Sequence, residues 1–187
     1  TVLNTDIFYN YEYAFYDSHL VSEFEKFKSH YIRFSTKPFD FLNIQAGLGT
    51  GNEIAYREEI PKLGDRFSFN TSIEVTLNNN LRIKPSVNFS KLKKLDSQEY
   101  FFDGYIARFD IRYQFTNSLN LRVISEYNEF SDQIFVQPLI SWRPNSDTIF
   151  YLGGNQNYID EFVDYNSPNY RVNKSQLFLK FQYLIKS

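Results

Sequence analysis

Charged side chains recur at every second position along several segments of this sequence. Arg108, Asp110 and Arg112 are the clearest example, because a period of two places all three on one face of a β-strand. Such a row could line a wet interior that selects or binds an anionic or sugar-like solute. The row could instead pair internally, with Glu74 and Glu126 as counter-charges from facing strands. We favour internal pairing, because a barrel of about ten strands leaves little room for a channel. The candidate lumen-facing residues are Arg66, Glu74, Arg82, Lys84, Arg108, Asp110, Arg112, Arg122, Glu126, Arg143 and Lys180.

Apolar side chains fill the positions between the charged ones. In the segment 67–77 the apolar row is interrupted only by Thr71. In a membrane barrel this row faces lipid. A tyrosine row near the start of the chain (Tyr9, Tyr11 and Tyr13) then contacts lipid headgroups rather than serving as a stacking platform for sugars. The candidate lipid-facing residues are Phe67, Phe69, Ile73, Val75, Leu81, Ile83, Phe109, Ile111, Tyr113, Leu121, Val123, Ile140, Trp142, Leu179, Phe181 and Tyr183.

Residues for catalysis are scarce. The histidines are His19 and His30, and a hydrolase would need one of them beside a nucleophile with a third group to orient it. Ser18 adjoins His19, but neighbours on a strand point to opposite faces. The sequence contains no cysteine and no nucleophile elbow, phosphate-binding loop or zinc motif. We therefore expect no enzymatic activity and no cofactor.

Two further clusters have both a functional and a structural interpretation. Asp160, Glu161 and Asp164 could supply carboxylates to calcium, but their spacing matches no established loop and a solvated surface run is favoured. Three alternating glycines resemble a phosphate cradle, but no helix follows to bind an anion at its N-terminus. Bending or close packing of a strand explains them better. These glycines are Gly47, Gly49 and Gly51.

The composition fits one domain of a particular class. The chain has 187 residues and a net charge of −2, which provides no basic field for nucleic acid. Its mean hydropathy is −0.45, and no apolar run approaches the ~18 residues of a transmembrane helix. Aromatic residues make up 19% of the chain. Aromatic girdles at two membrane interfaces would use residues of this kind, although a soluble β-sandwich could also be rich in them. No signal peptide is present and the first residue is not methionine, so we expect a processed or partial chain.

Alternation predicts about ten strands, each near the ~9–11 residues that cross a bilayer when tilted. The expected strands are 7–16, 29–35, 42–56, 67–77, 81–92, 105–115, 119–128, 136–143, 148–158 and 176–186.

The predicted connections alternate in length along the chain. Short turns are expected at 36–39, 78–80, 116–118 and 144–147, and longer loops at 17–26, 58–65, 93–101 and 159–173, with a brief exception near Ser131. Short periplasmic turns and long extracellular loops are typical of outer-membrane barrels, and this sorting places the C-terminus in the periplasm. Residues 1–3 look like the end of an earlier strand and residues 4–5 like its turn. The chain would then be the C-terminal part of a larger barrel, the alternative being a frayed tail.

Four runs resemble a family of uncharacterised Bacteroidetes proteins designated domain of unknown function 5916. They are FDIRYQFT at 109–116, LNLR at 119–122, TIFYLG at 148–153 and LFLKFQYL at 177–184. The resemblance extends from about Arg66 to the end and lies in the C-terminal barrel region of that family. It implies an outer-membrane location and a connection with glycans.

The sequence therefore predicts an all-β, antiparallel, up-and-down transmembrane β-barrel in the outer membrane of a Gram-negative bacterium. We expect an anchor, a scaffold or a narrow solute conduit, with membrane lipid and other outer-membrane proteins as partners and no nucleic acid. A second hypothesis is a subunit of a larger outer-membrane assembly. The alternative is a soluble β-barrel or sandwich that binds an apolar ligand, with the apolar rows turned inward.

Overall fold

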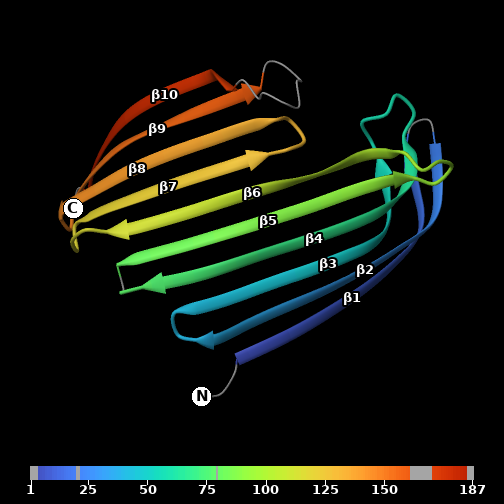
Figure 1. Ribbon diagram of the computed structural model, residues 1–187, viewed down its shortest axis with the longest axis horizontal. Helices are drawn as coiled ribbons and strands as arrows, with labels where there is room; N and C mark the ends of the chain where they lie inside the picture. Colours follow the sequence, from blue (N-terminus) through green and yellow to red (C-terminus); the bar gives the residue numbers. More distant parts are fainter. Residues whose placement is uncertain (1–3, 20–21, 79, 161–169, 185–187) are drawn as a thin grey trace. The chain divides into compact units, whose positions relative to one another are not determined.

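The computed structural model describes residues 4–19, 22–78, 80–160 and 170–184, all as strands and their connections (Figure 1). The strands of the first half are β1 (Asn4–His19), β2 (Ser22–Phe39), β3 (Leu42–Ala55), β4 (Lys62–Leu77) and β5 (Leu81–Lys94). Those of the second half are β6 (Tyr100–Gln114), β7 (Leu119–Asn128), β8 (Gln133–Asn145), β9 (Thr148–Asp160) and β10 (Tyr170–Tyr183). The all-β prediction is confirmed for the described residues.

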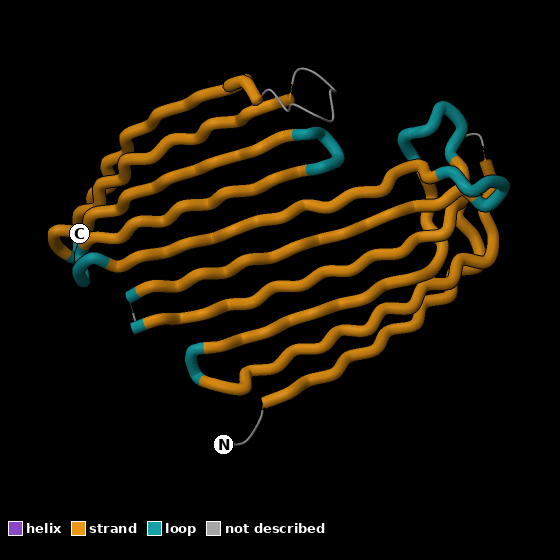
Figure 2. The backbone as a smooth tube through the Cα atoms, in the orientation of Figure 1, coloured by secondary structure: helices purple, strands orange, loops and turns teal. Residues whose placement is uncertain are grey.

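The ten strands form one sheet in chain order, from β1 to β10. Sequential neighbours pair antiparallel, as the registers of β1 with β2 and of β7 with β8 show. This is the predicted up-and-down topology with the predicted number of strands. Among the described residues, β1 and β10 stand at the two ends of this order. The tube in Figure 2 shows strand and loop throughout, and the described part of the chain holds no helix long and apolar enough to cross a membrane.

The chain divides into two compact units. The first comprises the described residues within Thr1–Ile73 and Ser86–Tyr105, and the second those within Glu74–Pro85 and Ile106–Ser187. Consecutive strands lie side by side within each unit, with β1 to β3 in the first and β7 to β10 in the second (Figure 1).

The strands are longer than the sequence pattern predicts, so several loop predictions are wrong. The expected loop 17–26 is mostly strand, because β1 continues to His19 and β2 begins at Ser22. The loops expected at 58–65 and 93–101 shrink to 56–61 and 95–99. The turn expected at residues 4–5 lies inside β1, and residues 1–3 are outside the described residues. Polar side chains do not prevent strand pairing, since the ladder uses only backbone groups.

Two prolines explain why two predicted turns are displaced. Proline cannot donate to a strand ladder, which predicts that Pro38 and Pro144 lie in turns. The strands instead run through both residues, and the connections follow at 40–41 and 146–147. Each proline lies in a register shift, between Thr36 and Phe39 in β2 and between Trp142 and Asn145 in β8. A local irregularity of this kind accommodates the missing N–H.

The other two short turns are confirmed. The connection at 78–80 begins with Asn78 at a φ of 51°, a left-handed conformation that asparagine tolerates. In the connection after β6, the Thr116 hydroxyl accepts hydrogen bonds from the backbone N–H groups of Ser118 and Leu119. Side-chain hydrogen bonds of this type fix the chain reversal.

Few apolar side chains are buried among the described residues. The buried ones are Ile54, Ala55, Leu92 and Ile124. Large apolar side chains are instead exposed on strands of both units, for example Ile32 and Phe69 in the first and Phe109 and Ile140 in the second. The rows that alternation predicts to be apolar are thus not sequestered in a core.

Candidate functional site

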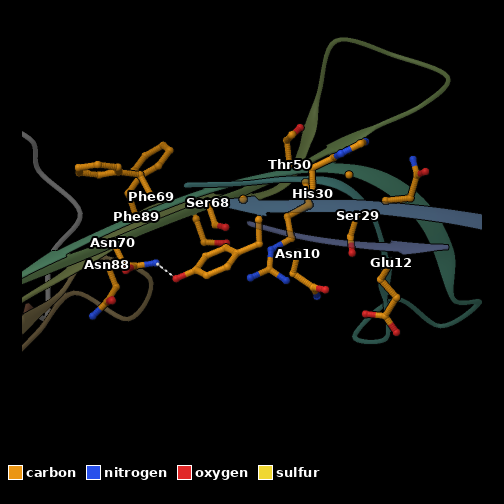
Figure 3. Close-up of a pocket in the computed structure, with 16 residues that line it drawn as sticks. Asn10, Glu12, Ser29, His30, Thr50, Ser68, Phe69, Asn70, Asn88 and Phe89 are labelled. Carbon is orange, nitrogen blue, oxygen red and sulfur yellow. Dashed lines mark hydrogen bonds between the residues drawn. The ribbon is translucent and has the colours of Figure 1, made fainter. Parts of the chain in front are cut away.

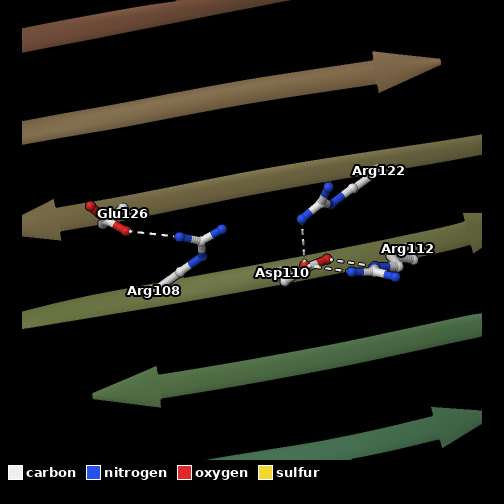
Figure 4. A network of polar contacts seen from close by, with 5 residues as sticks. All are labelled: Arg108, Asp110, Arg112, Arg122 and Glu126. Atoms are coloured by element: carbon white, nitrogen blue, oxygen red, sulfur yellow. Dashed lines mark hydrogen bonds and ion pairs between the residues drawn. The ribbon is translucent and has the colours of Figure 1, made fainter. Parts of the chain in front are cut away.

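The β6–β7 hairpin brings most of the predicted charged residues together. Arg108 lies opposite Glu126, and Arg112 lies opposite Arg122, so the four side chains share one face. Arg108 Nη1 donates to Glu126 Oε2 at 3.2 Å (Figure 4). The predicted pairing of Glu126 with the β6 row is therefore confirmed.

Asp110 holds the two remaining arginines of this hairpin. Arg112 donates to it through Nε and Nη2, both at 3.1 Å, and Arg122 donates through Nη2 at 3.1 Å (Figure 4). Like charges directly opposite each other on paired strands destabilise a sheet. The carboxylate of Asp110, with a side chain only 15% exposed, offsets this repulsion with charge-assisted hydrogen bonds.

The other predicted charged residues have different neighbours. Glu74 pairs with Arg82 at 3.6 Å rather than with the β6 row. Arg66 pairs with Glu53 at 3.2 Å. The Lys180 ammonium lies 5.8 Å from the centre of the Tyr151 ring, a cation–π distance. Lys84 and Arg143 are exposed in β5 and β8.

An open pocket of about 390 Å³ lies against this cluster in the second unit. Arg82, Arg112 and Arg122 line it together with neutral polar side chains that include Asn120 and Ser141. No carboxylate lines this pocket, and Asp110 is not among its lining residues. Leu81, Tyr113, Leu121 and Leu139 complete the wall, so the pocket presents guanidinium and amide donors beside apolar groups.

The first unit has a separate polar groove of about 420 Å³. Its lining includes Gly49, Asn70 and the Tyr31 ring, and Asn70 Nδ2 donates to the Tyr31 hydroxyl at 3.4 Å (Figure 3). The rings of Phe69 and Phe89 point away from this side of the strands. The groove thus lies on the polar face of the first unit.

The three alternating glycines allow close packing at this groove, Gly47 and Gly49 against side chains and Gly51 against backbone. A Cβ on Gly47 would collide with the Tyr31 hydroxyl and the Asn70 amide, and one on Gly49 would lie 2.6 Å from Ser68 Oγ. Gly51 has a φ of +148°, and a Cβ there would meet the backbone of Lys28. Close packing is therefore their role, as predicted in preference to a phosphate cradle.

Sequence reasoning missed several residues of these polar faces. Glu53 has the same parity as the alternating glycines, so extending the period of two through β3 would have placed it with Arg66. Tyr31 and Asn70 carried a weaker signal, because only the register between strands shows that they meet.

The predicted lipid-facing residues of the second unit lie on the opposite face of the same strands. Tyr113, Leu121, Ile140, Leu152 and Leu179 are successive cross-strand partners from β6 to β10. Phe109, Ile111 and Val123 lie on this same apolar face, because side chains alternate between the two faces along each strand.

Aromatic side chains gather where this apolar face meets the short turns. Trp142 lies opposite Phe150, and Phe150 opposite Phe181. Their ring centroids are 5.3 Å and 5.0 Å apart in turn. Tyr113 adds an edge-to-face contact with Phe115 at 4.7 Å. Tyr183 follows two residues after Phe181 and is exposed.

The predicted lipid-facing residues of β4 and β5 in this unit alternate with charged ones. They are Val75, Leu81 and Ile83, and the charged residues are Glu74, Arg82 and Lys84.

Thr71 is a polar residue on the apolar face of the first unit, and its hydroxyl has a local partner. Thr71, which interrupts the row between Phe69 and Ile73, donates its hydroxyl to the Gln45 carbonyl at 3.1 Å. Phe67 contacts Phe89 with ring centroids 6.1 Å apart. The distinction between a lipid-facing and a lumen-facing side stays a prediction.

The remaining candidates do not assemble into a site within the described residues. No cluster of three or more metal-ligating side chains is found there. Of the proposed calcium ligands, Asp160 ends β9, whereas Glu161 and Asp164 fall outside the described residues. His30 contacts Tyr9 and Tyr11, and Ser18 and His19 are adjacent in β1.

Comparisons of this chain with protein-family models, with curated proteins and with solved structures found no match.

Proposed function

We propose that this chain contributes ten strands to an outer-membrane β-barrel with a non-enzymatic role. Its apolar rows contact lipid and its charged rows face the wet interior. The single observation that carries the proposal is the reversal of exposure around Asp110 in β6. Phe109 and Ile111 are 49% and 37% exposed, whereas the Asp110 side chain between them is 15% exposed. A water-soluble sheet would shelter the phenylalanine and expose the carboxylate.

The spacing of aromatic residues on β9 supports the same proposal. Phe150 lies at the short-turn end of the apolar row and Tyr158 eight positions further along. At a rise of ~3.3 Å per residue these positions are ~26 Å apart along the strand. A tilt of about 40° reduces this to ~20 Å along the membrane normal, close to the apolar band of ~25 Å between aromatic girdles.

The role that fits this arrangement is an anchor or scaffold with, at most, a narrow conduit. Asp110, Glu126 and Glu74 each hold at least one arginine across the polar face, and paired charges restrict the space for a solute. A Gram-negative outer membrane is the proposed location, since β-barrels of this topology occur there. The resemblance to the Bacteroidetes family is part of the same proposal.

The single tryptophan makes the proposal testable. The chain would be refolded into vesicles of phosphatidylcholine, and Trp142 emission would be measured with brominated lipids and with aqueous iodide. We expect brominated lipids to quench Trp142 emission, most strongly when the bromine atoms lie near the lipid headgroups. The reason is that Trp142 lies in the aromatic row beside the turn. We expect little quenching by iodide.

The matched control moves the indole by one residue. The double variant Trp142→Phe, Ser141→Trp places it on the polar face, and its emission should lose bromine quenching and gain iodide quenching. Absence of bromine quenching in the parent chain would contradict a lipid-facing apolar row. If the parent stays soluble without detergent and neither agent quenches Trp142, the soluble alternative with apolar residues inside would replace the proposal.

A further inference from the structure

The polar face of the second unit carries an excess of cations. A chain with a net charge of −2 would not be expected to concentrate positive charge on one face of one unit. The cationic residues of its strand rows include Arg82, Lys84, Arg108, Arg112, Arg122 and Lys180, and the carboxylates of the same rows among the described residues are Glu74, Asp110 and Glu126. Even if every carboxylate of these rows pairs with one cationic side chain, a net positive charge remains on this face.

The pocket of about 390 Å³ lies against three of these arginines. Arg82, Arg112 and Arg122 reach it, and its remaining polar wall consists of neutral groups such as Asn80, Gln114 and Asn120. Counting the carboxylates that hold these arginines, Glu74 and Asp110, one positive charge is left. An anion in the pocket would neutralise it.

Arg122 supplies a second, independent indication. A guanidinium has five N–H donors in a fixed plane, and one of those of Arg122, its Nε, is buried without a hydrogen-bond partner. A buried donor without a partner lowers stability, because it has left water without gaining a new hydrogen bond. An acceptor beside Nε would remove that cost. Nη2 of the same guanidinium already donates to Asp110 at 3.1 Å, so Nε is the donor that an oxyanion would pair.

We propose that this pocket is a binding site for a small soluble oxyanion of the phosphate or carboxylate class. Arg122 and Arg112 bind the anion directly, and Arg82 adds charge from the neighbouring strand. Asp110 acts as a positioning residue, since its carboxylate fixes both guanidinium groups side by side. The site does not depend on what covers the apolar face, so it is independent of the proposed membrane location.

The test follows the arginine Nε–Hε resonances of the full chain in non-ionic, phosphate-free detergent. Inorganic phosphate, acetate and a short-chain phospholipid would be titrated separately, and the Arg122 signal would be assigned from its loss in Arg122→Gln. We expect phosphate to shift the Arg122 and Arg112 signals saturably. Arg122→Gln should weaken phosphate binding, followed through Arg112, by about tenfold or more.

Two further variants keep the inference falsifiable. Arg57→Gln removes the same charge from a connection of the first unit and should leave the affinity unchanged. Arg122→Lys keeps the charge without the planar fork and should weaken binding, which covers the case in which the glutamine variant fails to fold. Three outcomes would overturn the site: no saturable shift with phosphate or acetate, equal weakening in Arg57→Gln, or a response to phospholipid alone.

Discussion

The Tyr9 hydroxyl lies 2.9 Å from Nδ1 of His30, and both side chains belong to rows that also hold the apolar residues Ile7 and Ile32. Thr71, another polar residue on the apolar face, likewise has a local partner, because its hydroxyl donates to the Gln45 carbonyl. In hydrocarbon, an unpaired polar group costs several kcal/mol, because no water can replace the missing partner. Local hydrogen bonds therefore make these exceptions compatible with a lipid-facing row.

Removal of the Tyr9 hydroxyl tests this pairing. Tyr9→Phe leaves His30 Nδ1 without its partner, and we expect the free energy of unfolding from vesicles to fall by about 0.5–1.5 kcal/mol. Tyr11→Phe is the control, since Tyr11 contacts the imidazole through its ring at 4.8 Å. Urea titrations monitored by tryptophan emission would measure both. Equal losses of unfolding free energy in the two variants would show that the hydrogen bond between Tyr9 and His30 adds no stability of its own.

The glycines of β3 should differ in their tolerance of alanine. Gly51 has a φ of +148° and a backbone neighbour where Cβ would lie, so Gly51→Ala should destabilise the fold by more than about 1 kcal/mol. Gly49→Ala would meet the Ser68 hydroxyl, which can rotate away, and should cost less. Denaturant midpoints in detergent would rank the two variants, and the reverse order would contradict close packing at Gly51.

Loss of the Asp110 carboxylate should destabilise the β6–β7 hairpin. Asp110→Asn leaves Arg112 opposite Arg122 without an intervening negative charge, and we expect a loss of about 1–3 kcal/mol in unfolding free energy. Glu126→Gln removes one ion pair between more exposed groups and should cost less. The same denaturant titration compares them. A null effect of Asp110→Asn would show that solvent already screens the two arginines.

Alternation alone predicts much of this fold. The period of two identifies the strands and the two faces, since each face holds every second residue and the apolar set is distinct. It also predicts that Arg108, Asp110 and Arg112 share a face and that Glu126 lies within reach. These are local properties of one strand or one hairpin, and a single sequence contains them.

Other features depend on information that alternation lacks. Residues 17–26 resemble a loop because charged and small polar residues interrupt the apolar row, but strand pairing of the backbone continues through most of them. Pro38 and Pro144 suggest turns, but register shifts absorb them. Alternation does not predict the arginine pocket, because the pocket depends on which residues of five successive strands, β4 to β8, lie opposite each other.

A charge at the centre of the apolar face provides the most direct energetic test of lipid contact. Val123 lies midway along β7 between Leu119, which is opposite Trp142, and Tyr127. Val123→Arg should lower the unfolding free energy in vesicles by about 2–4 kcal/mol, the cost of a cation near the bilayer midplane. Gln137→Arg, on the polar face of the adjacent strand, is the control and should change stability by less than about 1 kcal/mol. Reversible refolding titrations of both variants would measure the difference. Equal costs would mean that the two faces meet the same solvent, which a membrane-spanning strand does not allow.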